Sequence, residues 1–368
     1  MKNTTLLKGL GILLIITHNY THWLPDCVAE NEYSFSVERI DLLCSYLAQG
    51  GPHVLLNILS HFGHYGVAIF LFVSGYGLVK KYEAQPSLQL SLSWRKKVEE
   101  EVFFIFGHAV KLWKLMVPAL LLFVLIEMMQ GTWNRPLSRL FPLLGFYSNL
   151  QPHRDLILGP WWWFGLMMQF YILWRLLIYR RSRAVLYTTM GVCLAAVIAV
   201  AWLERGSLES AKTLTCYLHY NFPPSMLAFG LGVADARYGL SWLHRWWSPL
   251  VGIALVLLGS FNAGMWTVSS VGALMVALAF VAKKDGEVHF GRVLYINMRM
   301  MLVFLGSISA WLFAFHPVVR EYTIGLARRG NDWLLYLSIL IYLMATILLA
   351  WTATTIVNNK KTKSSHNK

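Results

Sequence analysis

The sequence predicts an all-α protein, a polytopic transmembrane bundle of about ten helices with both termini in the cytoplasm. Of the 368 residues, 57% are hydrophobic and 14% are charged, too few charges to cover a soluble domain of this length. The apolar residues gather in blocks of membrane-spanning length, which is about 20 helical residues. The cations are divided unevenly between the two sides of these blocks.

Short polar stretches separate the apolar blocks and leave no room for a separate soluble domain. We assign residues 1–357 to a single membrane-embedded domain and residues 358–368 to a polar cytoplasmic tail. Lys2 and Lys8 before the first block resemble a signal peptide, but no small-residue cleavage pattern follows, so we expect a retained helix. The expected spans are residues 6–24, 61–80, 113–130, 161–179, 184–203, 221–236, 247–261, 264–282, 301–320 and 333–357.

The distribution of Lys and Arg gives the orientation. With the N-terminus inside, 23 of the 32 cations lie on the cytoplasmic side and 9 on the outer side, as the positive-inside rule requires. The net charge of +14 is therefore topogenic, and we expect no nucleic-acid partner, because no polar domain carries a basic patch interleaved with aromatics.

Two connecting segments are long. The outer segment 25–60 carries most of the outer acids, and it also contains Cys27 and Cys44, so a disulfide between them is one alternative that the sequence leaves open. The inner segment 81–110 mixes basic and acidic runs. It is typical either of an interfacial amphipathic helix that leads into the third span or of a solvated connector.

A histidine in the first span is the leading candidate for chemistry. His18 follows an unbroken apolar run, and ionisable groups inside spans are costly enough to suggest a function. Its near-neutral pKa suits a general base, although a histidine that only hydrogen-bonds within the bundle is the alternative. His22 lies one turn on, but no Cys or carboxylate is placed to complete a metal site, and we predict no metal.

Three further clusters contain candidate site residues. The second span has three glycines around Ser74 and Tyr76, which we group with His18 as candidate catalytic residues, although a small-residue packing face explains the same pattern. Lys111 and Lys114 share one helical face and are suited to a phosphate, or are ordinary topogenic lysines. The fourth span opens with aromatics that are typical of an interfacial belt or of a sugar or lipid head-group site: Trp161, Trp162 and Trp163, with Gln169 below.

These clusters, in this order, resemble the acyltransferase-3 family of integral membrane O-acyltransferases. The likeness covers nearly the whole chain and rests on five short motifs. They are Lys8 with His18, Gly66–Tyr76, Lys111 with Lys114 and Pro118, Trp163–Tyr171, and Ser307–Pro317, which includes His316. The chain departs from the family pattern in having Lys8 for the usual arginine, ten rather than eleven positions before His18, and Trp311 where an aromatic hydroxyl is common.

The resemblance implies a bacterial cytoplasmic-membrane enzyme that moves an acyl group, usually acetyl from acetyl-coenzyme A, to a hydroxyl. The acceptor would be an extracytoplasmic carbohydrate, glycolipid or lipid-linked molecule, as in O-acetylation of polysaccharides. In this interpretation His18 is the essential residue, Lys8, Lys111 and Lys114 bind the donor, and the Trp residues, Gln169 and His316 bind substrate. Direct transfer at a mid-membrane site and a covalent relay both fit.

Two other functions fit parts of the sequence. A transporter or flippase would use the intramembrane histidines as a proton or substrate path, without acyl turnover. Against it, the two halves of the chain do not show broken helices in corresponding positions. A scaffold with a decayed site would tolerate the loss of His18.

Overall fold

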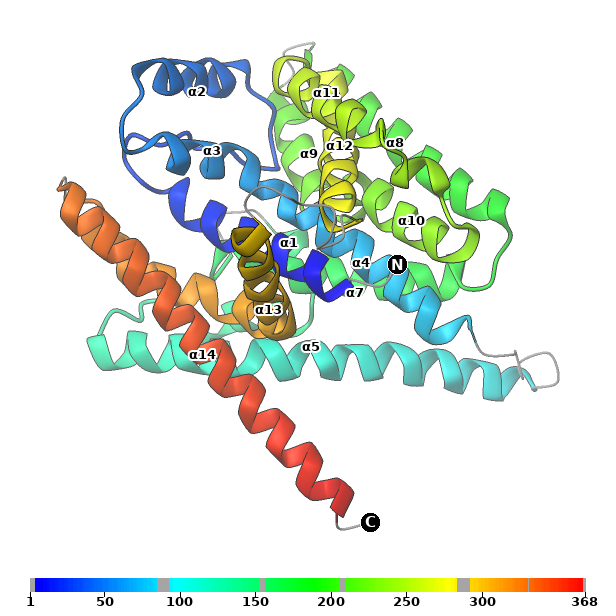
Figure 1. Ribbon diagram of the computed structural model, residues 1–368. Helices are drawn as coiled ribbons and strands as arrows, with labels where there is room; N and C mark the ends of the chain where they lie inside the picture. The colour runs from blue at the N-terminus through cyan, green and yellow to red at the C-terminus, as the bar shows by residue number, and fades with distance from the viewer. Residues whose placement is uncertain are drawn as a thin grey trace.

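A computed structural model shows that the chain is an all-helical bundle (Figure 1). The structure describes residues 4–84, 93–151, 156–205, 209–282, 292–329 and 331–366, and within these ranges it contains no β-strand. The all-α transmembrane fold class predicted from the sequence is confirmed. The number of spans and the side of each terminus stay predictions.

The helices follow the apolar blocks of the sequence. A 3₁₀ turn, η1 (Gly63–Tyr65), joins the third and fourth helices, and a π-helical turn, η7 (Trp174–Ile178), extends the seventh. The α-helices are α1 (Thr4–Thr21), α2 (Val37–Gln49), α3 (Val54–Phe62), α4 (Gly66–Tyr82), α5 (Trp94–Gln130), α6 (Leu140–Leu144), α7 (Trp162–Leu173), α8 (Arg183–Arg205), α9 (Glu209–His219), α10 (Phe222–Tyr238), α11 (Ser248–Phe261), α12 (Ala263–Ala282), α13 (Arg292–Ala327) and α14 (Asp332–His366).

Six helical segments of the described chain are long and apolar enough to cross a membrane. They contain α3 with α4, α5, α8, α12, α13 and α14. The four other expected spans also form helices, namely α1, α7 with η7, α10 and α11. Several helices run beyond the expected spans: α13 begins at Arg292, and α14 continues through His366, into the expected polar tail.

The inner segment before the third span is helical over its described part. Residues 94–130 form one continuous helix of 37 residues, α5, rather than a solvated connector that leads to a separate span. Large apolar side chains on its first three turns, including Trp94, Val98, Val102 and Phe103, are exposed, beside the charged residues of the same segment. This pattern agrees with the amphipathic alternative.

The first helix lies in the middle of the bundle, between α4 and α13 (Figure 1). Glycines allow this close packing, because an added Cβ on Gly9 would collide with the carbonyl oxygen of Leu302, and one on Gly306 with the carbonyl oxygen of Thr5. On the other side of α1, a Cβ on Gly66 would lie 2.5 Å from the carbonyl oxygen of Gly11. Small residues therefore bring three backbones into contact, as is common in membrane bundles.

Two helix starts are explained by their local sequence. The pair Pro223-Pro224 occupies the first turn of α10, where proline is tolerated because the first N–H groups have no partner within the helix. At the tight turn between α11 and α12, the Oδ1 of Asn262 accepts hydrogen bonds from the N–H groups of Gly264 (2.9 Å) and Met265 (3.1 Å). This bond pattern is an N-cap, so α11 and α12 form a hairpin.

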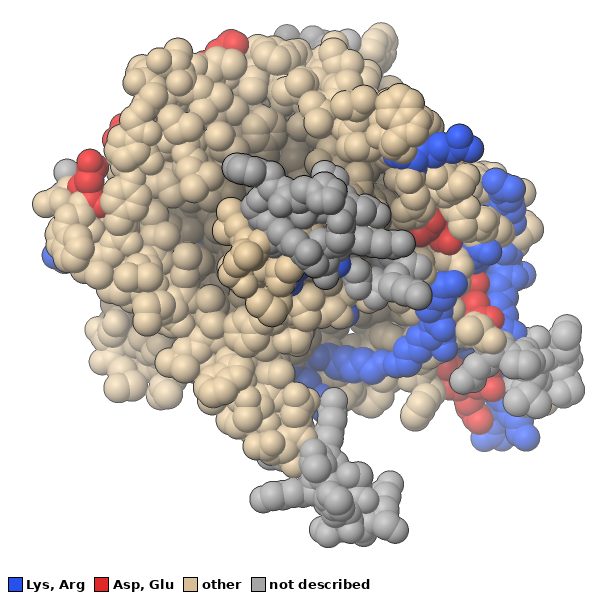
Figure 2. All heavy atoms as spheres, viewed as in Figure 1, with Lys and Arg blue, Asp and Glu red and all other residues tan. Residues whose placement is uncertain are grey.

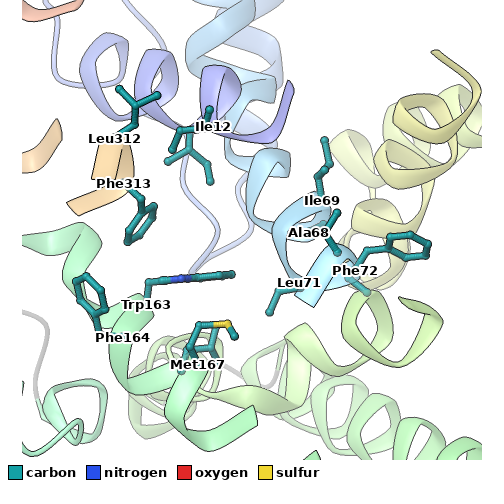
Figure 3. Packing of buried hydrophobic residues seen from close by; sticks show 14 of the residues in the cluster. Ile12, Ala68, Ile69, Leu71, Phe72, Trp163, Phe164, Met167, Leu312 and Phe313 are labelled. Carbon is teal, nitrogen blue, oxygen red and sulfur yellow. The ribbon is translucent and has the colours of Figure 1, made fainter. Parts of the chain in front are cut away.

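The core between α1, α4, α7 and α13 is filled by aromatic and branched side chains (Figure 3). The ring of Trp163 extends from α7 toward Leu71 of α4, and its centroid lies 5.7 Å from that of Phe313 on α13. Because lipid chains are as apolar as these side chains, the contacts stabilise the bundle through close packing rather than through the hydrophobic effect. These ring contacts pack α7 against α4 and α13.

Charged residues mark the two ends of the bundle. Figure 2 shows Lys and Arg gathered at one side, over the end of α4 and the start of α5, while acids dominate the opposite edge of this face. This separation agrees with the expected orientation. Some of the cations counted in the sequence lie outside the described residues, namely Lys2, Arg154, Lys283, Lys284 and Lys368.

We expect Gly306→Ala to destabilise the bundle. Alanine favours a helix over glycine by about 1 kcal/mol, but here its Cβ would meet the backbone of α1, and overpacking costs about 1–3 kcal/mol. Gly107→Ala on α5 is the matched control, because its Cβ would meet nothing within 4 Å. The check is the melting temperature of each variant in detergent, and equal melting temperatures would contradict this packing.

We also expect a membrane-impermeant maleimide added to intact cells to label Cys44 and not Cys27. Both are free thiols in the structure, and Cys44 is exposed on α2. Burial raises the pKa of the Cys27 thiol to about 12, which suppresses the reactive thiolate. Cys44→Ser should remove the label that appears in this segment. Labelling of Cys44 only after reduction would instead indicate a disulfide in cells.

Candidate active site

The candidate site surrounds His18, near the outer end of α1. The break between α3 and α4 lies directly on this residue, because Gly63 in η1 has no side chain: a Cβ there would come within 2.6 Å of the Cβ of His18. The imidazole is buried by η1 and by the end of α3. A larger residue at position 63 would push the two elements apart.

One hydrogen bond fixes the tautomer of His18. Its Nδ1 lies 2.8 Å from the carbonyl oxygen of Ser60, and a carbonyl can only accept, so Nδ1 carries the proton. In the neutral ring, Nε2 is then left with a free lone pair. The ring stacks on His22 with centroids 4.8 Å apart, and it meets His64 edge-on at 5.7 Å.

The outer segment after α1 is held onto α3 by two buried polar side chains. Asn57 accepts a hydrogen bond from the N–H of Val28 at 3.0 Å and donates to the carbonyl oxygen of Asp26 at 3.1 Å. The hydroxyl of Ser60 donates to the carbonyl oxygen of Val28. These bonds replace the water that an irregular backbone would otherwise need, and they place the acids that follow over His18.

Two acids of this segment face the histidines. Glu32 brings Oε2 to 4.0 Å from Nε2 of His18, on the side opposite the Ser60 carbonyl. Glu30 is buried, accepts a hydrogen bond from Arg39 at 2.8 Å, and lies 3.3 Å from Nδ1 of His61. Among the described residues, Glu30 therefore pairs with an arginine, whereas the neighbouring Glu32 does not.

Burial governs the protonation of both acids. It raises the pKa of Glu32 to about 7, because a carboxylate is poorly solvated there. Burial also raises the pKa of Glu30, although the neighbouring Arg39 works in the opposite direction. Glu32 is therefore divided between its acid and its carboxylate near neutral pH, and such a group can give or take a proton.

A cavity opens beside this cluster. Its walls come from the outer segment, η1, α4, α7, α8, α9, α10 and α12, and about 650 Å³ of space lies within it and its mouth. The polar and aromatic residues on its walls include Glu32, His64, Trp162, His219, Trp266 and Ser270. Glu32 and His64 therefore belong both to the cavity and to the surroundings of His18.

The other candidate catalytic residues lie apart from His18. Ser74 bonds to the carbonyl oxygen of Phe70 at 2.8 Å within its own helix, and it is about 16 Å along the helix axis from Gly63. Tyr76 is buried beyond it, with Nζ of Lys80 5.5 Å from its ring centroid. Neither residue belongs to the outer cavity.

The three candidate donor-binding lysines face the inner half of the bundle. Lys8 is about 15 Å along α1 from His18. Lys111 and Lys114 are both exposed on α5. One turn before Lys111, His108 is buried, with its ring centroid 4.3 Å from that of Tyr171. The structure thus places the basic pair beside a second buried polar cluster.

The aromatic and amide candidates of the fourth span separate into different environments. Trp162 is on the cavity wall, whereas Trp161 donates to the carbonyl oxygen of Ala314 at 3.1 Å within the core, where Trp163 is also buried. Gln169 donates to Asn221 at 2.6 Å and accepts from the N–H of Phe222 at 3.1 Å. Its amide therefore caps α10, away from the cavity.

His316 occupies a buried position on α13. Its Nδ1 lies 2.9 Å from the carbonyl oxygen of Phe313, and its Nε2 has no hydrogen-bond partner in the described part of the chain. One turn on, Arg320 is also buried, with its guanidinium 5.3 Å from the ring centroid of Trp23. Sequence reasoning counted Arg320 among the outer-loop cations, but it is within α13, four residues from His316 and on the same helical face.

Sequence reasoning did not single out Glu32, Glu30 or Arg320 for the site. The outer acids were visible as a group, but an irregular segment has no periodicity that would place one of them on His18. His64 lies within the second expected span, residues 61–80, and its sequence context suggested no role. Within the described ranges, no group of three or more His, Cys, Asp and Glu side chains is arranged to hold a metal ion.

Comparison with known proteins identifies the family of the chain. The model of the acyltransferase-3 family, described as an acyltransferase domain, matches residues 3–355. Comparison with curated proteins and with solved structures gave no match. Since the family match covers nearly the whole chain and the bundle contains six long apolar helices, the chain belongs to the acyltransferase-3 family and is a multi-pass membrane acyltransferase.

Proposed function

We propose that the protein transfers an acetyl group from acetyl-coenzyme A to a hydroxyl of an extracytoplasmic carbohydrate or glycolipid. The enzyme would lie in the cytoplasmic membrane of a bacterium, with His18 as the general base. The observation that supports this most is the hydrogen bond from Nδ1 of His18 to the Ser60 carbonyl. It leaves the basic Nε2 on the side of Glu32 and the cavity.

The chemistry follows from that tautomer. Nε2 takes the proton of the acceptor hydroxyl as its oxygen attacks the carbonyl carbon of the acyl donor. The new ester C–O bond forms, the thioester C–S bond breaks, and the leaving thiolate receives the proton. Glu32, at 4.0 Å from Nε2, stabilises the imidazolium that exists between these steps when its carboxyl is ionised.

The donor approaches from the inner side in this proposal. Lys111 and Lys114 are exposed on α5, where they can bind the phosphates of coenzyme A. Lys8, on α1, would add a third positive charge for the donor phosphates. The acids at the outer edge would repel such an anion, so charge favours entry from the cytoplasm.

The acceptor occupies the outer cavity. Trp162 and Trp266 offer aromatic faces, which pack against the apolar faces of sugar rings, and Ser270 offers a hydroxyl. Among the three tryptophans of the fourth span, we therefore assign acceptor binding to Trp162.

We expect His18→Ala to abolish acyl transfer. Membranes with wild-type protein, given radiolabelled acetyl-coenzyme A and an extract of envelope glycans and lipids, should transfer label to the extract. Loss of a general base lowers the rate by roughly 10²- to 10⁴-fold. His53→Ala is the matched control, because this ring is 27% exposed beside Asp332 in the outer region.

Equal transfer by wild type and His18→Ala, at equal protein level, would remove His18 from catalysis. Movement of a substrate across the membrane without acyl turnover would instead favour a transporter.

The rate of transfer should depend on the ionisation of Glu32. Its pKa is raised to about 7, so the carboxyl is neutral well below pH 7 and ionised well above it. Because the ionised form supports the imidazolium, kcat should rise between pH 6 and pH 8. Glu32→Gln should lower kcat by roughly 10- to 100-fold and flatten this rise. Glu38→Gln, at an exposed acid on α2, is the control. The same pH profile in Glu32→Gln and wild type would rule out this role.

A further inference from the structure

An apolar groove separates α1 and α4 from the α11–α12 hairpin. Among the described residues, all that line it are apolar except Tyr65. The groove has a volume of about 450 Å³, which lies within the range of roughly 300–1,000 Å³ that ligand pockets span. It follows α12 for about 10 Å inward from Ala273 to Phe280. Other lining residues are Leu10, Leu14, Ile69 and Val256.

The mouth of the groove faces the bilayer. Ile253 and Leu257 on its rim are 47% and 49% exposed, and neighbouring residues of α11 such as Leu250 and Leu258 are exposed too. Figure 2 shows a hollow in this face of the molecule, between the part that contains α2 and α3 and the part that contains α11 and α12. In a membrane these surfaces meet hydrocarbon, so the groove is suited to a lipid chain.

Tyr65 is a wall that this groove shares with the catalytic cavity. Its ring lies on the wall of the groove, and its hydroxyl donates to Oγ of Ser269 at 2.9 Å, a residue on the wall of the cavity. The next ring is that of His64, whose centroid lies 4.0 Å from that of Tyr65 and 5.7 Å from that of His18. The groove and the catalytic histidines are therefore separated by only one or two side chains.

The cavity indicates the kind of polar end. Its described walls contain Glu32 but no Lys or Arg, so they offer no cation to an anionic group. Trp162, Trp266 and the hydroxyls of Thr267 and Ser270 provide surfaces for a sugar ring. A neutral sugar fits this lining better than a phosphate.

We propose that the acceptor is an amphipathic lipid, with one hydrocarbon chain in the groove and a neutral glycosyl head group in the cavity. This inference rests on the proposed function, because it names the acceptor of that reaction. It selects a lipid-borne sugar over a free polysaccharide. A chain held beside α12 would also keep the reacting hydroxyl close to His18. The reaction would then be effectively unimolecular, because the hydroxyl no longer has to reach the site by diffusion.

The test uses binding rather than turnover. Full-length protein in phosphatidylcholine nanodiscs is irradiated with a dodecyl β-glucoside that carries a diazirine at the end of its chain, and the labelled residues are mapped by mass spectrometry. We expect label on the lining of the groove, above all on residues 273–280 of α12. Unlabelled dodecyl β-glucoside should compete for it, and methyl β-glucoside should not.

Two variants and one control make the labelling specific. Ala273→Trp, at a half-buried lining position, should fill the groove and lower the labelling at least tenfold, and the milder Ala277→Leu should lower it partly. Leu258→Trp, at an exposed position of α11 that does not line the groove, should leave it unchanged. Size-exclusion profiles identify any variant that does not fold.

The outcomes separate this inference from the proposed function. His18→Ala should be labelled like wild type, because the chain site does not need the base. If the groove is labelled but the protein transfers no acyl group, the groove is still a lipid-binding site and the proposed enzyme mechanism is wrong. Label spread evenly over bilayer-facing helices, or label that is competed equally by added phosphatidylcholine, would overturn the groove as an acceptor site.

Discussion

The architecture depends on the contact of α1 with two other backbones through glycine. Gly9 and Gly306 bring α1 against α13, and Gly66 brings α4 against the opposite face of α1. In a bilayer, apolar side chains gain little by leaving lipid for protein, so shape and close contact must hold the helices together. Everything that surrounds His18 depends on this packing, because η1 reaches the histidine only if α4 approaches α1 without side chains between them.

Hydropathy predicted where the helices lie, because every expected span of residues 6–357 coincides with helical structure. It did not predict their ends: α5 continues 19 residues upstream of residue 113, since charged turns beside an exposed apolar stripe remain helical at an interface. For the site, His18 was visible as a polar residue after an apolar run. Glu32 was not, because hydrogen bonds to Asn57 and Ser60 place its segment, and these join residues about 30 positions apart. The capping role of Gln169 on α10 is likewise a tertiary contact.

The outer half of the bundle concentrates polar groups where a membrane protein normally has few. Glu30, Glu32, His61 and His64 are packed around His18 at low exposure, and each would be costly alone. Burial raises the pKa of both acids, but Arg39 pairs with Glu30 and opposes that shift. The two acids therefore differ in environment, which leaves one as a structural counter-ion and the other free to change its protonation.

The partner of His18 at Nδ1 is a main-chain oxygen, and this has an evolutionary consequence. No side-chain substitution at position 60 can remove that carbonyl oxygen. The tautomer of His18 is therefore insensitive to which residue occupies position 60. The walls of the neighbouring cavity, by contrast, consist of side chains contributed by several separate helices. In the proposed mechanism, relatives of this enzyme can thus diverge in the molecules they modify while Nε2 of His18 stays in place. Reactivity and selectivity are encoded in different parts of the polypeptide and can be inherited independently.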